Sequence, residues 1–162
     1  MRVKPRVLFL AALPLAVSAT AQTKVSGTIQ CKAGDVKPVE IGDKPGHAFA
    51  IFQGDCTWMK PMEIGGVQTK TGTDTVASEL SGNGSTDRGY HVDTMANGDK
   101  FTVRFQGSGK SKDGKQASGS GTWTFVDGTG KVKGIKGGGK YKSTASPDGT
   151  TTTEVEGEYK LP

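Results

Sequence analysis

Apolar and polar residues alternate with a period of two over long parts of this chain, the pattern of β-strands that bury one face. Residues 101–106 show it most clearly, because Phe101, Val103 and Phe105 alternate with polar side chains. In residues 150–160 a row of glutamates alternates with threonine, valine and tyrosine, so we expect the glutamates to face water. The pattern predicts about eight short strands. They cover residues 24–30, 47–58, 75–80, 87–95, 101–106, 117–125 and 150–160, with another beginning at Tyr141.

Turn signals separate these strands. Asn97-Gly98 predicts a two-residue hairpin, because both residues tolerate positive φ. Further turns are expected at Asn83-Gly84, at Asp127-Gly128 and at residues 147–149.

Some segments are less regular. Residues 54–55 suggest a bulge or turn, residues 107–115 a polar, flexible link, and residues 132–135 a bend or a single helical turn. In residues 87–95 we expect Tyr90 and Val92 to share one face.

Glycine is abundant, with 25 residues, all after position 21. A glycine inside a helix costs about 1 kcal/mol relative to alanine, so long helices are excluded. We predict an all-β fold, a single antiparallel up-and-down β-barrel of about eight strands. A β-sandwich is the competing architecture, and glycines within the strands favour the barrel because they allow sharp coiling.

The first 21 residues have the features of a secretory signal peptide. Basic residues precede an apolar run over residues 7–17, and Ala19-Thr20-Ala21 supplies small residues for cleavage. The run is too short to span a bilayer, which takes about 20 residues. We therefore expect residues 22–162 to form one domain, periplasmic or secreted, without a membrane span after cleavage; the oligomeric state is not predicted.

The net charge of residues 22–162 is small and indicates no particular class of partner. Arg2, Lys4 and Arg6 lie in the leader, and removing them from the 21 basic residues leaves 18 against 16 acidic residues. This balance argues against nucleic acid as a partner. Lysines gather within residues 110–115 and 131–142, where they fit solvated loops and edge strands or a polysaccharide contact.

Cys31 and Cys56 are the two cysteines, and outside the cytoplasm such a pair predicts a disulfide. No C-x-x-C motif or histidine cluster accompanies them, so we predict no metal and no cofactor. His91 and Asp93 project from the same strand face and could act as a base and its orienting partner, although such a pair is more often a surface contact.

Aromatic residues supply the bulk for a core, and a few of them could line the mouth of a barrel and hold an apolar molecule. Trp58, Phe105 and Trp123 are our candidates for that role. Arg104 would hold a carboxylate ligand if the polar strand face formed the interior, but burial energetics favour Arg104 pointing to solvent.

A resemblance rests on motifs in the last 70 residues or so. They are Asn97-Gly98-Asp99, Gly121-Thr122-Trp123, Gly128-Thr129-Gly130-Lys131 with Gly134-Ile135 and Gly137-Gly138-Gly139, and Glu156-Gly157-Glu158-Tyr159. Residues 90–159 resemble exported bacterial proteins of the allene oxide cyclase-like and dirigent-like β-barrel family. The resemblance implies the fold, and it carries no catalytic residue over to this chain.

Three functions remain open. The first is non-catalytic binding of a small apolar ligand or a surface partner, which the aromatic residues favour. The second is an enzyme of the cyclase or isomerase type, by analogy of fold. The third is a structural or polysaccharide-associated role through the lysine-rich segments.

Overall fold

The structure, a computed structural model, describes residues 22–112 and 115–162. The predicted signal peptide, residues 1–21, lies outside the described residues. Within the described part of the chain, no helix is long and apolar enough to cross a membrane.

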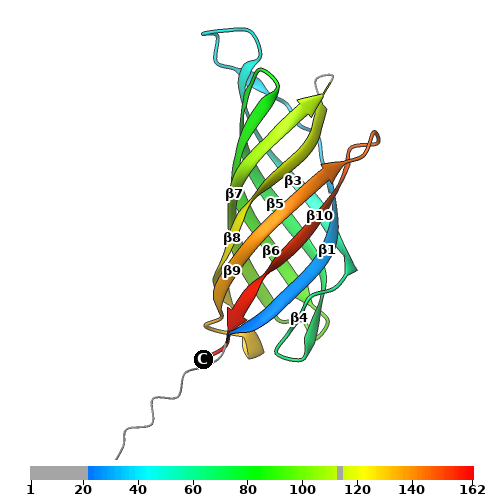
Figure 1. Ribbon diagram of the computed structural model, residues 1–162, viewed down its shortest axis with the longest axis vertical. Coiled ribbons are helices and arrows are strands. Elements are labelled where there is room, and N and C mark those ends of the chain that lie inside the picture. Colours follow the sequence, from blue (N-terminus) through cyan, green and yellow to red (C-terminus); the bar gives the residue numbers. More distant parts are fainter. Residues whose placement is uncertain (1–21, 113–114) are drawn as a thin grey trace, which may run out of the picture.

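Eight long strands form the body of the molecule (Figure 1). They are β1 (Thr23–Ala33), β3 (His47–Lys60), β5 (Val67–Ser81), β6 (Gly84–Met95), β7 (Lys100–Lys112), β8 (Lys115–Gly128), β9 (Lys136–Ala145) and β10 (Thr150–Lys160). The remaining elements are short: β2 (Val39–Glu40), β4 (Glu63–Ile64) and the 3₁₀ turn η1 (Gly130–Val132).

The long strands close into an up-and-down barrel. Each pairs in antiparallel fashion with the next along the chain, β10 pairs with β1, and β3 pairs with both β1 and β5. This continuous ring of pairing confirms the predicted barrel and excludes the sandwich. Closure leaves no free edge among the eight strands, which removes the usual route to strand-to-strand aggregation.

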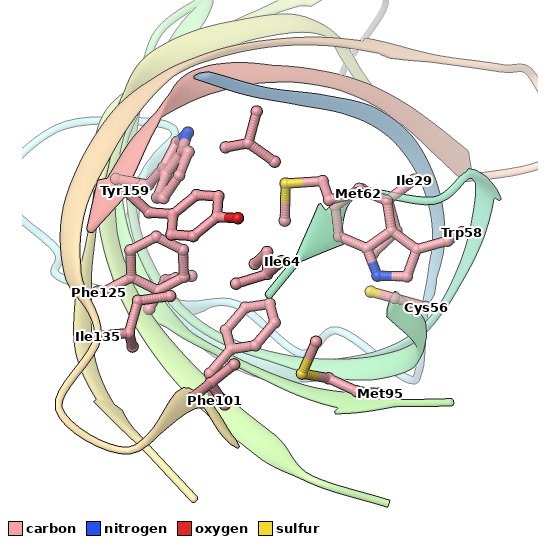
Figure 2. Close-up of a cluster of buried hydrophobic side chains, with 14 residues drawn as sticks. Ile29, Cys56, Trp58, Met62, Ile64, Met95, Phe101, Phe125, Ile135 and Tyr159 are labelled. Carbon is pink, nitrogen blue, oxygen red and sulfur yellow. The ribbon is translucent and has the colours of Figure 1, made fainter. Parts of the chain in front are cut away.

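The two ends of the barrel differ. At the lower end in Figure 1, a cluster of buried side chains fills the interior, and β4 and η1 contribute to it. Ile64, Val132 and Ile135 are each 0% exposed there, and Phe101 is 2% exposed. Figure 2 shows Ile64 surrounded by aromatic and sulfur-containing side chains. We call this the closed end.

The upper end carries the hairpin between β5 and β6 and the hairpin between β9 and β10, together with the loop that contains β2 (Figure 1). A cavity in the interior reaches this end, where Ala33, Gly119 and Thr151 line it. We call it the open end.

Several local predictions need correction. β3 pairs with β5 without interruption across residues 54–55, so these residues form neither a bulge nor a turn. The segment expected to be a flexible link, residues 107–115, mostly continues β7 to Lys112 and pairs with β6 and β8. Residues 75–80 are the second half of the long β5.

The prediction that Tyr90 and Val92 share one face of β6 is confirmed. That face is the outer one, where they are 48% and 40% exposed. The polar residues His91 and Asp93 point inward instead, at 8% and 0% exposed. The inner surface of this barrel is therefore partly polar.

Candidate functional site

The cavity at the open end has a volume of about 170 Å³. Its wall is mostly apolar and aromatic, with Phe52, Val76, Phe105 and Tyr141 among the lining residues. Two carboxyl groups and one imidazole interrupt this surface, from Asp74, Asp87 and His91. An enclosed apolar pocket with a few converging polar groups is the usual form of a small-molecule site.

A line of hydrogen bonds runs along the inner wall formed by β3, β5 and β6, at the level of His91. The imidazole Nδ1 lies 2.7 Å from Asp74 Oδ1, and Nε2 lies 3.2 Å from Asp93 Oδ2. The indole Nε1 of Trp58 donates to the same Asp93 oxygen over 2.5 Å. His91 is thus held between the carboxyl groups of Asp74 and Asp93, and the Trp58 indole of β3 in turn holds Asp93.

Strand register and one glycine create this arrangement. Asp74 of β5 is the cross-strand partner of His91 of β6, and Gly72 is the partner of Asp93. The imidazole lies on the bare backbone of Gly72, where a Cβ would collide with Nε2 and Cε1. Absence of a side chain at Gly72 lets the ring reach both carboxylates at once.

Burial and pairing act in opposite directions on the pKa of His91. Burial is the largest influence and lowers it, but the hydrogen bonds and charges of Asp74 and Asp93 outweigh burial and raise the pKa from 6.5 to about 9. His91 therefore carries a positive charge at neutral pH.

Burial shifts the pKa of Asp93 upward, whereas it shifts the pKa of His91 downward. Burial raises the pKa of this carboxyl, and the contacts from His91 and Trp58 lower it by a smaller amount. Its Oδ1 has no hydrogen-bond partner among the described residues. Asp93 is therefore a fully buried carboxyl, with one oxygen held by His91 and Trp58 and the other without a partner among the described residues.

Asp87 forms a second polar position nearer the open end. Its two oxygens accept hydrogen bonds from Ser78 Oγ at 2.6 Å and Ser85 Oγ at 2.8 Å. Tyr141, from the opposite wall, lies across Gly121 and places its hydroxyl on Gly107, the cross-strand partner of Asp87. Burial, with the charges of Asp87 and Asp74, raises the pKa of the Tyr141 hydroxyl to about 12, so it stays protonated.

Three of the four residues that the sequence suggested for ligand binding lie on this cavity: Trp58, Phe105 and Trp123. The indole of Trp58 is engaged with Asp93, and that of Trp123 donates to the Lys140 carbonyl at 3.2 Å. Phe105 packs edge-on against Tyr141, with ring centroids 6.2 Å apart. Arg104 is exposed on the outer face of β7, the arrangement that burial energetics favoured, and it does not line the cavity as the alternative interior position would require.

Cys31 and Cys56 form the predicted disulfide, which joins directly paired residues of β1 and β3. The two sulfurs and an Asp74 oxygen lie within 4.8 Å of one another, a grouping that could hold a metal if the thiols were free. Because the sulfurs are bonded to each other, they supply no thiolate, and this grouping does not make a metal site.

Sequence reasoning missed Asp74, Asp87 and Tyr141 as site residues. It identified the His91–Asp93 pair but expected a surface contact, whereas both residues are buried inside the barrel. The sequence does not show which β5 residue pairs with His91. The charge and hydrogen bonding of His91 depend on that residue, which is Asp74.

Fold and site together define a small disulfide-linked β-barrel that is packed at one end and hollow at the other, with an ionisable cluster on the cavity wall. One similar solved structure is a conserved protein of unknown function from Rhodopseudomonas palustris, with 12% identity, a TM-score of 0.51, and coverage of 86% of this chain and 98% of the other. This likeness shows the fold alone.

A pterocarpan synthase dirigent protein is also similar, with 11% identity, a TM-score of 0.45, and coverage of 95% of this chain and 98% of that protein. No family model and no curated protein matches the chain.

Proposed function

We propose that this chain is an exported binding protein that takes up a small, mostly apolar molecule through the open end of the barrel. The observation that carries the proposal is the cavity, about 170 Å³ in volume and lined largely by apolar and aromatic side chains. The other end is filled, so a ligand would enter from the open end.

Cavity size limits the ligand. An engineered protein cavity of roughly 150 Å³ binds benzene, whereas pockets for drug-sized molecules reach about 300–1,000 Å³. A volume of about 170 Å³ therefore suits one six-membered ring with a short substituent. Polycyclic molecules and long acyl chains would project from the barrel.

The disulfide supports the exported part of the proposal, because such bonds form and persist outside the reducing cytoplasm. We also propose, from the motifs within residues 90–159, that the chain is a member of the allene oxide cyclase-like and dirigent-like barrels.

A direct test is titration of the purified, oxidised protein with 2-phenylethanol, a neutral one-ring probe. We expect saturable quenching or enhancement of the tryptophan fluorescence, because Trp58 and Trp123 line the cavity. Amide shifts in an NMR titration should map to the cavity-lining parts of β5, β6 and β7. No saturable response to any one-ring probe at millimolar concentration, neutral or charged, with no shifts at those strands, would overturn the proposal.

A second candidate function, proton-transfer catalysis of the isomerase type, is favoured by one observation. His91 lines the cavity, holds a proton at neutral pH, and is hydrogen-bonded to carboxylates that could accept one. Ionisable groups with displaced pKa values in a cavity are typical of active sites, although structural networks show them too.

This candidate is tested with phenylacetone, a one-ring ketone, incubated with the protein in D₂O at pH 7. An enzyme of this type would speed exchange of the hydrogens beside the carbonyl, and His91→Gln would abolish the acceleration while His47→Gln would retain it. An exchange rate equal to that in buffer would remove this candidate and leave ligand binding untouched.

A further inference from the structure

The charged groups on the cavity wall are of one predominant sign. Among the described lining residues, the ionisable side chains that carry charge at neutral pH are Asp74, Asp87 and His91. Arg88 and Arg104 both lie exposed on the outer surface. No lysine or arginine is among those lining residues.

The single positive charge is already matched. His91 is hydrogen-bonded to Asp74 on one side and Asp93 on the other, so one cation faces two carboxyl groups. Asp87 then adds a further carboxylate, which accepts hydrogen bonds from the neutral hydroxyls of Ser78 and Ser85. Even with Asp93 protonated, Asp74, His91 and Asp87 together leave the cavity negative.

The Tyr141 hydroxyl lies beside these carboxylates. Its ring reaches from β9 across Gly121 to Gly107, the cross-strand partner of Asp87, and burial, together with the charges of Asp87 and Asp74, raises the pKa of the hydroxyl. The hydroxyl therefore lies in the field of both carboxylates. In a low-dielectric interior such fields are stronger than at the surface.

Aromatic surfaces flank the same space. Phe105 and Tyr141 meet nearly at right angles, with an interplanar angle of 82°, and Phe52 also lines the cavity. The Phe105 ring lies over Gly89, two residues from both Asp87 and His91 along β6. Aromatic faces beside carboxylates are the combination that recognises organic ammonium ions.

From this charge distribution we infer that the barrel selects cationic ligands: small one-ring molecules that carry a protonated amine, with the ammonium toward Asp87 and Asp74 and the ring against the aromatic wall. The inference rests on the proposed ligand-binding function and specifies its ligand class. An anionic molecule of the same size would meet the Asp87 carboxylate, whose hydrogen-bond partners are neutral hydroxyls, and would be rejected.

Three probes of nearly equal shape separate this inference from the proposed function. They are 2-phenylethylamine, which is a cation at pH 7, neutral 2-phenylethanol, and the phenylacetate anion, each titrated calorimetrically into the purified, oxidised protein. We expect the amine to bind about tenfold or more tightly than the alcohol, and the acid to bind more weakly than both. Equal binding of amine and alcohol would overturn the inference and keep the proposed function, whereas no binding of any probe would overturn the proposed function itself.

A variant locates the source of the preference. In Asp87→Asn the amide retains the shape of the carboxylate and can still bond the serine hydroxyls, but the charge is gone. We expect the affinity ratio of amine to alcohol to fall by about tenfold, with the affinity for the alcohol nearly unchanged. Asp55→Asn, which removes an exposed carboxylate from the outer face of β3, is the matched control and should leave the ratio unchanged.

Unchanged selectivity in Asp87→Asn would contradict the assignment of the ammonium to this carboxylate. Because the comparison of the three probes uses the wild-type protein, the test does not depend on the variant folding.

Discussion

His91 keeps its proton inside the barrel because both ring nitrogens have a carboxylate partner. A buried histidine without such partners loses its charge, since burial disfavours the ionised form. Here the pairing outweighs burial, and the residue binds a proton more tightly in the folded chain than in the unfolded chain. That difference links the stability of the fold to pH.

We expect the free energy of unfolding to decrease as pH rises from about 6.5 to 9. The His91 pKa is 6.5 when unfolded and about 9 when folded, so its contribution is complete below pH 6.5 and is lost as pH passes 9. The loss is on the order of 3 kcal/mol, because one pKa unit corresponds to about 1.4 kcal/mol. Urea unfolding at several pH values measures it.

The control for this prediction is the second histidine. The pKa of His47 is also raised, by Glu79 and Asp43, but the residue is at the surface. His47→Gln should retain most of the pH dependence, whereas His91→Gln should flatten the curve above pH 6.5. Parallel curves for wild type and His91→Gln would contradict the assignment.

Gly72 is the residue on which the His91 position depends. In Gly72→Ala the new methyl group would occupy the place of the imidazole edge, and either the ring or the β5 backbone must move. We expect a destabilisation of about 1–3 kcal/mol, as for a steric clash in a packed interior, together with a His91 pKa closer to 6.5. Thermal unfolding and an NMR titration of the imidazole measure the two effects.

Gly84→Ala is the matched control, because a Cβ there has only backbone oxygens near it, the nearest at 3.6 Å. It should change stability by less than about 0.5 kcal/mol. If Gly72→Ala also changed stability by less than about 0.5 kcal/mol, the imidazole would not lie against Gly72 as it does in the structure.

The faces of single strands were only partly predictable from residue types. In β7 the rule that aromatic residues face inward holds, since Phe101 is 2% exposed and Arg104 points to solvent. In β6 the same rule selects Tyr90 and Val92 and gives the wrong face, because this strand borders the polar part of the cavity. Hydrophobicity alone does not distinguish a hollow interior from a filled one.

At the scale of elements, the hairpin between β5 and β6 determines whether His91 meets a carboxylate. The turn consists of Gly82 and Asn83, with Ser81 paired to Gly84, and this register places Asp74 opposite His91. A turn at Asn83-Gly84, as the sequence suggested, would place Val76 there instead. A shift of one residue in a turn moves the pairing by two, so the site was not predictable although both strands were.

The closed end depends on short elements that the period-two pattern does not describe. β4 and the segment after η1 insert Ile64 and Ile135 into the barrel, and both are fully buried. We expect Ile135→Ala to destabilise the protein by about 2–5 kcal/mol, because it removes a large buried side chain from a packed cluster. Chemical denaturation with a constant m-value measures the change.

Ile51 provides the same substitution at a site of opposite burial, since it is 76% exposed on the outer face of β3. Ile51→Ala should change stability by less than about 0.5 kcal/mol. Similar losses in both variants would mean that η1 and its neighbours do not close the barrel.

For the whole molecule, ring closure is the consequence of many local preferences that agree. Glycines bring adjacent strands and inward rings close together, hairpins keep neighbours in sequence as neighbours in space, and the pairing of β10 with β1 completes the circle. The sequence supports each hairpin, but no local signal states that β10 returns to β1. That pairing spans the length of the domain, and only the gain from removing both edges favours it.

The hollow end gives a prediction that separates folding from binding. Thr153 lines the cavity from β10, and Thr153→Phe would fill much of its volume with a ring that needs no new polar partner. We expect binding of 2-phenylethylamine to weaken by more than about tenfold, because the ligand and the new side chain compete for one space, while the melting temperature stays equal or rises, as cavity filling generally stabilises. Thr122→Phe adds the same ring to the outer face of β8 and should leave the affinity unchanged. Retained binding in a folded Thr153→Phe protein would place the ligand outside the barrel, and the interior would then be a structural void.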